Sequence, residues 1–133
     1  MAQKVTIDYG QADIAAFKQG ALSGHIKFDP RAVDDVVRVY DVLIDGLKEE
    51  RKRIRDIMNV AGFGGFPSTQ QLASGFTAKA AQLADVLDQF IEGAMHLQEA
   101  YLIAGGKIKE AEVKNAQAIR FAGQQIGTEN PAQ

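Results

Sequence analysis

Apolar residues recur at helical spacing over two long stretches of the chain. In the first, they follow intervals of mostly three and four residues from Val33 to Met58. This spacing places them on one face of a helix. Asp29 and Pro30 come just before, and these residue types are favoured at the N-cap and the first position of a helix. We therefore predict a helix from about residue 30 to about residue 60.

The second stretch has the more regular pattern, with intervals that alternate between four and three residues. Its apolar positions are Leu83, Leu87, Phe90, Ala94, Leu97, Tyr101, Ala104, Ile108 and Ala111. The pattern predicts a helix from residue 69 to at least residue 104. Gly105 and Gly106 follow, and each Gly is about 1 kcal/mol less favourable than Ala inside a helix. We expect the helix to bend or fray at this pair and then to resume in part.

A glycine-rich segment separates the two predicted helices. Residues 61–67 read AGFGGFP, and three Gly with one Pro do not continue a helix at low cost. The segment is therefore a predicted turn, and one of its central glycines is expected to have a positive φ. The two aromatic side chains of this turn would either cover the end of the core or form a protruding binding site at the tip of the two helices. The turn motif is Phe63, Gly64, Gly65 and Phe66.

Two long helices joined by a short turn form an antiparallel hairpin, so the fold class is predicted to be all-α. The chain has 133 residues, which is room for one domain. Residues 1–28 are predicted to be an irregular N-terminal extension, with a short helix from Gln11 to Gln19 packed against the body. Residues 29–112 form the hairpin domain, and residues 113–133 form a partly helical or flexible tail.

The apolar faces of the two helices are wider than one helix–helix contact covers. Burial of one Leu or Phe side chain contributes ~1.5–3 kcal/mol, so a lone hairpin would leave apolar surface in water. A second hairpin would complete a four-helix bundle, as a homodimer or as a heterodimer with a related chain. The alternative is that residues 1–28 fold back over the stripe. The predicted dimer interface is Leu83, Leu87, Phe90, Ala94, Leu97 and Tyr101.

Composition narrows the range of functions. The chain has no Cys and two His, which excludes disulfides, thiolate catalysis and a His-rich metal site. The 15 Lys and Arg nearly balance 17 Asp and Glu, so there is no strongly basic field to hold nucleic acid. The longest aliphatic run, residues 42–44, is far shorter than the ~20 residues of a membrane span. We predict no enzymatic activity, no cofactor, no nucleic-acid partner and no membrane insertion.

Charged residues on the predicted helices are expected to face solvent. A catalytic acid needs burial or a like-charged neighbour to shift its pKa, and the pattern indicates neither. His25 and His96 have no second ligand at metal-binding spacing. The densest charge run is residues 48–56, KEERKRIRD. The acidic pairs at helical spacing are Asp34/Asp35, Asp41/Asp45 and Asp85/Asp88.

The order of helix, glycine-rich aromatic turn and helix resembles the WXG or ESX superfamily of type VII secretion substrates. Phe63-Gly64-Gly65 stands where that family has Trp-X-Gly. The phrases DPRAVDDVVRVYDVLIDGL (29–47) and GFGGFPSTQQLASGF (62–76) resemble the actinobacterial branch of the family. The resemblance covers residues 29 to about 112 and implies helical hairpins that pair as four-helix bundles, and export without a cleavable signal peptide.

The C-terminal export signal of this family is a Tyr followed four residues later by Asp or Glu. Tyr101 is followed at that distance by Gly105, whereas Ile108 and Glu112 have the spacing with Ile in place of Tyr. The candidate export-signal residues are Tyr101, Ile108 and Glu112. The resemblance thus implies a small protein that is exported by, or associated with, a type VII system and is cytoplasmic before export. The alternative is a cytosolic adaptor or chaperone-like partner that covers a larger effector or toxin.

Overall fold

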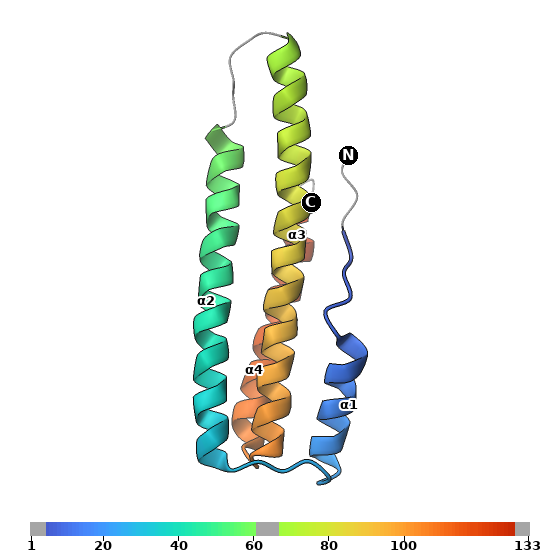
Figure 1. Ribbon diagram of the computed structural model, residues 1–133, viewed down its shortest axis with the longest axis vertical. Helices are drawn as coiled ribbons and strands as arrows, with labels where there is room; N and C mark the ends of the chain where they lie inside the picture. Colours follow the sequence, from blue (N-terminus) through green and yellow to red (C-terminus); the bar gives the residue numbers. More distant parts are fainter. Residues whose placement is uncertain (1–4, 61–66, 130–133) are drawn as a thin grey trace.

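The computed structural model describes residues 5–60 and 67–129, which form four helices (Figure 1). Helix α1 spans Gln11–Leu22, α2 spans Pro30–Val60, α3 spans Pro67–Ala104 and α4 spans Ile108–Glu129. These described ranges contain no strand, so the all-α prediction is confirmed. The predicted turn motif, residues 63–66, lies outside the described residues.

Helix α2 begins as the sequence predicts. The Asp29 carboxylate accepts a hydrogen bond of 2.8 Å from the backbone N–H of Arg31. The Asp29 carbonyl accepts another, of 3.0 Å, from the N–H of Val33. Asp29 is therefore the N-cap, which satisfies N–H groups that have no partner inside the helix. The bounds of α2 match the predicted helix of residues 30–60.

Helix α3 ends in a glycine C-cap, after which the chain reverses. Gly106 has a φ of 77°, in the left-handed region. Its N–H donates to the Ile103 carbonyl at 3.0 Å, and the N–H of Lys107 donates to the Leu102 carbonyl at 2.8 Å. These two bonds form a Schellman motif, which stops a helix. The chain is helical again from Ile108, as expected, but the glycine pair ends α3 and reverses the chain instead of bending or fraying one helix.

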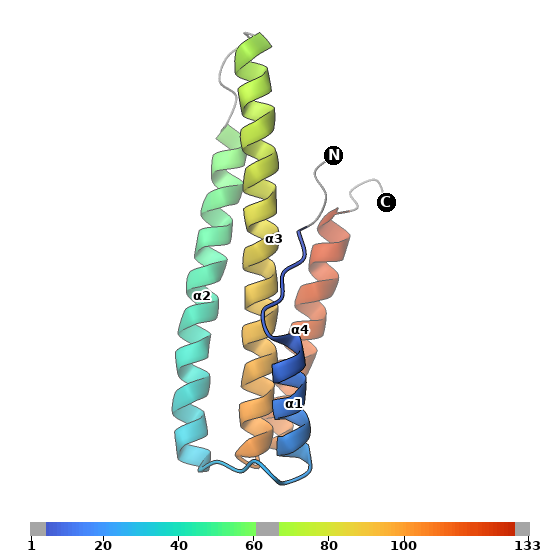
Figure 2. The same cartoon turned by 45° about the vertical axis from the view of Figure 1, so that its right-hand side comes forward.

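Helix α3 is the centre of the molecule, and the other three helices pack against it (Figures 1 and 2). Helices α2 and α3 lie side by side and antiparallel, but they are not the whole fold. The end of the hairpin near the C-terminus of α3 is also covered by α1 and α4 of the same chain. The two-helix description is thus corrected to four helices, because α1 and α4 bury apolar side chains that the sequence argument assigned to a partner.

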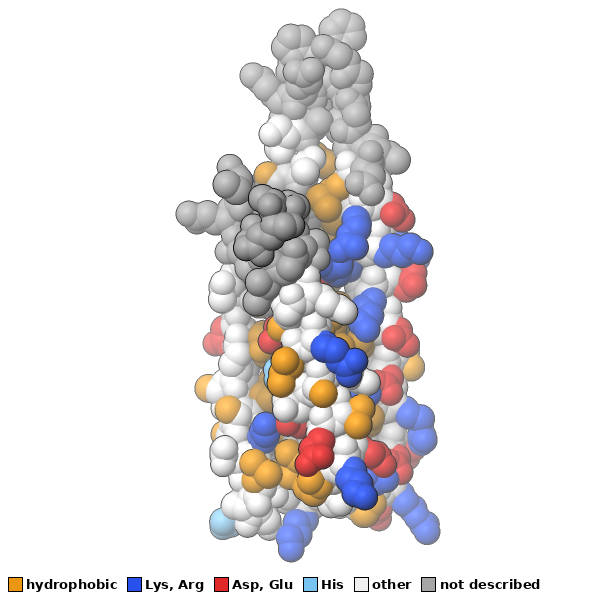
Figure 3. Space-filling view, turned by 180° about the vertical axis from the view of Figure 1, so that it is seen from behind, with side chains coloured by type: hydrophobic (Ala, Val, Ile, Leu, Met, Phe, Trp, Pro, Cys, Tyr) orange, Lys and Arg blue, Asp and Glu red, His pale blue; other side chains and the backbone are white. Residues whose placement is uncertain are grey.

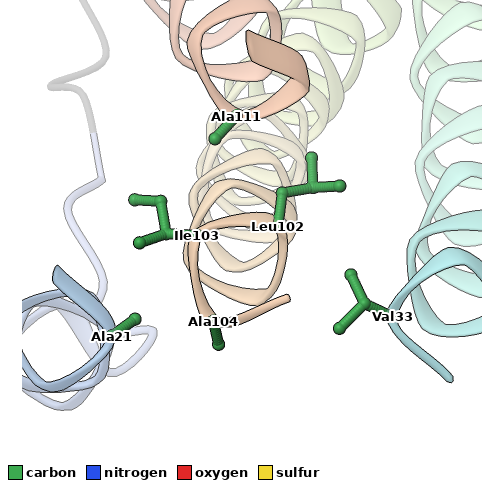
Figure 4. Close-up of a cluster of buried hydrophobic side chains, with 6 residues drawn as sticks. All are labelled: Ala21, Val33, Leu102, Ile103, Ala104 and Ala111. Atoms are coloured by element: carbon green, nitrogen blue, oxygen red, sulfur yellow. The ribbon is translucent and has the colours of Figure 1, made fainter. Parts of the chain in front are cut away.

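Two clusters of buried side chains hold these helices together. The first joins all four helices around the C-terminal end of α3 (Figure 4) and consists of Ala21, Val33, Leu102, Ile103, Ala104 and Ala111. The second joins α2, α3 and α4 further along and consists of Ile44, Ile91, Ala94, Met95 and Ala118. Helix α1 contributes to the first cluster, through Ala21, and not to the second.

Among the described residues, two helices form the opposite end of the hairpin. In both ribbon views α2 and α3 extend beyond the other described elements (Figures 1 and 2). Ile57, near the C-terminal end of α2, and Leu83, in the N-terminal half of α3, are both exposed. We call this two-helix part the distal arm. Within the described ranges, none of the helices combines the length and the hydropathy that crossing a membrane requires.

Candidate interaction surface

The predicted interface residues lie along α3 but differ in exposure. Leu83 is 50% exposed and Phe90 46%, whereas Ala94 is buried. The others, Leu87, Leu97 and Tyr101, are half-buried. The stripe therefore has an open part towards the distal arm and a part that is packed inside the chain. The dimer itself stays a prediction.

Tyr101 belongs to an aromatic cluster within the chain. Its ring meets Phe17 of α1 edge-on, with centroids 4.8 Å apart, and stacks on Phe28 at 5.7 Å. Tyr40 of α2 lies on another side, at 6.1 Å. Burial, with the nearby Tyr101, raises the pKa of Tyr40. Aromatic pairs of this kind contribute about 0.5–1.5 kcal/mol each beyond burial, so Tyr101 links α1 and α2 to α3.

The candidate export-signal residues do not form one helical motif. Tyr101 lies in α3, and Ile108 is the first residue of α4. The glycine cap at Gly106 separates them and reverses the chain. Ile108 and Glu112 are both exposed, one helical turn apart on α4. Of the candidate signal residues, Ile108 and Glu112 are therefore the ones exposed to a binding partner.

An apolar groove of about 200 Å³ runs over α3, between α2 and the N-terminal part of the chain. Phe90 and Leu43 are exposed at its edge, and Gly93 and Ala94 belong to its α3 side. Its lining is apolar apart from the Tyr hydroxyls and consists of Tyr9, Ile14, Tyr40, Leu43, Leu47, Phe90, Gly93, Ala94 and Leu97. The groove thus joins the open part of the predicted interface to α2.

One wall of the groove is an extended segment, residues 5–10, which we call the N-terminal strap. The Gln89 side chain holds it: Oε1 accepts a hydrogen bond of 2.8 Å from the N–H of Ile7, and Nε2 donates to the Val5 carbonyl. The Tyr9 ring lies directly on Gly93, where an added Cβ would come within 2.6 Å of it. Gly93 is therefore needed for the close approach of the strap to α3.

Two buried carboxylates on α3 are paired with cations from neighbouring helices. Asp88 forms an ion pair with Arg51 of α2, and Glu99 forms one of 3.0 Å with Lys18 of α1. His96 Nδ1 lies 3.6 Å from Glu99. The expectation that Asp88 faces solvent is wrong, because Arg51 reaches across and compensates its charge. Arg51 interrupts the apolar pattern of α2. This interruption is the sequence feature that could have indicated a buried ion pair at this position.

A polar cleft of about 430 Å³ separates α2 from α4. Gln98 is fully buried at its α3 side, and its Nε2 donates to the Val37 carbonyl at 2.9 Å and to Asp41 Oδ1 at 2.7 Å. Lys114 of α4 also donates to Asp41, at 3.0 Å. Seen from behind, Lys and Arg side chains gather over α2 and α4 (Figure 3). Asp41 is therefore not simply solvated, as the sequence argument expected, but links three helices.

Partial burial of the Asp41 carboxyl acts to raise its pKa. The hydrogen bonds from Gln98 and Lys114, with the charge of Lys114, outweigh that effect and hold the pKa of Asp41 below its ordinary value. Within the described part of the chain, no three His, Cys, Asp or Glu side chains gather as metal ligands would. The paired carboxylates serve to connect helices.

Family models, curated proteins and solved structures provide no match to this chain. By its described fold and surfaces, the protein is an all-α helical bundle with an apolar groove and a distal arm.

Proposed function

We propose that this protein is a small ESX/WXG-like helical protein that is exported by, or associated with, a type VII secretion system and acts by binding another helical chain. The observation that carries the proposal is the apolar groove with exposed Phe90 and Leu43 at its edge. The resemblance over residues 29–112 and the α2–α3 hairpin support it.

The groove suits the apolar face of an amphipathic helix. Such helices bind by placing side chains at successive turns into an apolar channel between elements. Aromatic side chains near the centre of an interface commonly carry much of the binding free energy. Phe90 has this position, because it lies between the groove and the distal arm. A partner helix along this line would cover Leu83, Leu87 and Phe90.

The distal arm gives a second reason to expect a helical partner. Its two helices have no third or fourth helix beside them in the described structure, and Ile57 of α2 and Leu83 of α3 are exposed. Two antiparallel helices bury little apolar surface, whereas four form a closed core. A hairpin from a related chain, or from a second copy, would complete a four-helix arrangement at this end.

The placement of Tyr101 favours a second candidate function. Tyr101 is half-buried in the aromatic cluster and lies before the cap that separates it from Ile108. A chain without an accessible signal of its own would travel with a partner or stay in the cytosol as an adaptor. We therefore keep the adaptor or chaperone-like function, covering a larger effector or toxin, as the alternative.

The assembly is tested with Phe90→Glu. The partially exposed position allows the variant to fold, whereas a partner would bury the new charge without a counter-ion, which costs several kcal/mol. We expect the assembly seen by light scattering to be lost, with circular dichroism unchanged. Ile119→Glu, on exposed α4 surface away from the groove, is the matched control. Equal assembly of Phe90→Glu and the wild-type protein would contradict the proposal.

Export is tested by cell fractionation in strains with and without the type VII ATPase. The proposed function predicts that the protein reaches the medium only when the ATPase is intact. Replacing Glu112 by Ala should lower export if the chain carries its own signal, whereas Val113→Ala should not. Protein that stays in the cytosol of both strains would support the adaptor function instead.

A further inference from the structure

The outer face of α2 carries apolar side chains that the fold does not use. Val42 is 73% exposed and Val39 is 68% exposed, the two highest values among the large apolar side chains of the described residues. They lie three residues apart, on one face of the helix. Neither lines the apolar groove, so this face is a separate surface.

Gly46 extends this face by one helical turn. A Cβ added to Gly46 would meet nothing within 4 Å, whereas one added to Gly93 or Gly105 would meet a neighbouring side chain at 2.6 Å or 3.0 Å. A Gly inside a helix costs about 0.5–1 kcal/mol relative to Ala. Packing within the chain explains the other two glycines but not Gly46. A small residue on a helix surface allows the backbone of another helix to approach closely.

Charged residues flank the apolar face in a self-complementary way. Arg38 and Asp45 are seven residues apart, which places them on the same flank, two turns from each other. In an antiparallel pair of α2 helices centred between residues 40 and 41, Arg38 of one copy lies two residues, about 3 Å along the helix axis, from the level of Asp45 of the other, which the long Arg side chain can reach. Val39 then faces Val42 of the second copy. A parallel pair would not bring these opposite charges together.

We propose that Val39, Val42 and Gly46 form a contact with the same face of α2 in a second copy of this chain, with the two helices antiparallel. Arg38 is held in this chain only by an exposed ion pair with Asp35, and exposed pairs of this kind contribute little. Arg38 can therefore turn to a partner at low cost. The contact lies outside the apolar groove, so it does not depend on the proposed function.

The pairing is expected to be weak. One helix–helix contact buries less than the roughly 1,200–2,000 Å² of a stable interface. Through this contact alone, we expect the chain to be mostly unpaired at low micromolar concentration and to associate as the concentration rises. Sedimentation equilibrium of the Phe90→Glu variant, in which the groove contact is removed, would show a weight-average mass that increases with concentration. A mass that stays at 14.4 kDa up to about 1 mM, the range of weak complexes, would overturn the proposal.

Disulfide cross-linking tests the register. The chain has no Cys, so introduced residues are the only thiols. A mixture of Val39→Cys and Val42→Cys should cross-link several-fold faster than either variant alone, because the antiparallel pair places these positions opposite each other. A mixture of Val113→Cys and Ile119→Cys, exposed on α4, is the control. Control cross-linking at the same rate would overturn the proposal.

Charge reversal separates pairing from folding. Arg38→Asp and Asp45→Arg should each weaken association several-fold, and the double variant should restore it. A merely structural role would not produce this restoration. Gly46→Gln should also weaken association, while Gly46→Ala should raise the thermal midpoint, since open space surrounds the site. Unchanged association of Gly46→Gln, or additive losses in the double variant, would overturn the proposal.

Discussion

At the scale of single residues, polar side chains inside the bundle connect helices. The amide of Gln98 bonds to α2, and Asp41 of α2 accepts from both Gln98 of α3 and Lys114 of α4. A buried donor or acceptor that loses its partner costs about 1–3 kcal/mol. Gln98 thus favours one alignment of α2 on α3. The sequence did not reveal this role, because a Gln beside the apolar stripe reads as a surface residue.

The Asp41 contacts predict a dependence of stability on pH. The pKa of Asp41 in the folded protein lies below the ordinary value of 3.8, so folding favours the charged carboxylate. The stabilisation is complete above the unfolded-state pKa and is lost as pH falls through the folded-state pKa. We expect Asp41→Asn to lower the urea midpoint at pH 7, and the difference from wild type to shrink below pH ~4. The midpoints are measured from pH 7 to pH 3.

Lys114→Met provides the control for that measurement. Without the Lys114 charge, Asp41→Asn should have a smaller effect at pH 7, because part of the interaction is already absent. If Asp41→Asn lowers the midpoint equally in both backgrounds, Lys114 does not act through Asp41.

At the scale of elements, the N-terminal strap depends on two residues of α3. The Tyr9 ring lies on Gly93, and Gln89 pairs with the backbone of the strap. The short helix expected from Gln11 to Gln19 is present, and it extends to Leu22. The sequence did not predict where this helix packs, because α1 carries no regular apolar stripe. The position of the N-terminal part of the chain follows from contacts between individual residues, such as the contact of the Tyr9 ring with Gly93.

Gly93→Ala tests the fit between the strap and α3. The new Cβ would lie 2.6 Å from the Tyr9 ring, so the ring must move away. We expect a loss of about 1–3 kcal/mol of stability, as for other overpacked sites. Hydrogen exchange at Ile7 should also become faster, because the strap loosens.

Two variants serve as controls for Gly93→Ala. Gly75→Ala makes the same change on the same helix, where open space surrounds the Cβ, and should be neutral or stabilising. Adding Tyr9→Ala to Gly93→Ala should remove the clash. A Gly93→Ala protein as stable as Gly75→Ala, with unchanged exchange at Ile7, would show that the strap does not need this glycine.

At the scale of the whole molecule, one chain supplies most of its own bundle. Helix α4 covers α3 through Ala111 and Ala118, and α1 covers the C-terminal end of α3. The apolar surface that the chain leaves open includes the groove, the distal arm and the outer face of α2 with Val39 and Val42. From the sequence alone, the whole stripe is expected to meet a second hairpin, with a fold-back of residues 1–28 as the alternative. The structure combines fold-back at one end with open surface at the other.

Removal of residues 107–133 tests the contribution of α4. The truncated chain would expose apolar surface around Leu102 and Met95, which α4 helps to bury. Each Å² of apolar surface that is no longer buried costs about 25 cal/mol of stability, so the truncation should clearly lower the urea midpoint. Binding of a hydrophobic dye should increase. Truncation after residue 129 is the control, and a midpoint that is equal for both truncations would show that α4 adds no stability.

The sequence by itself determined the two long helices, the start of α2 at Asp29 and the antiparallel hairpin. These features depend on local periodicity and on capping side chains a few residues apart. Tertiary structure alone decided the reversal at Gly106, the course of α4 and the pairing of Arg51 with Asp88. A glycine pair is compatible with both a bend and a stop, and an ion pair between helices depends on which faces meet. Long-range packing chose among these options, because only in the folded chain do distant residues share one environment.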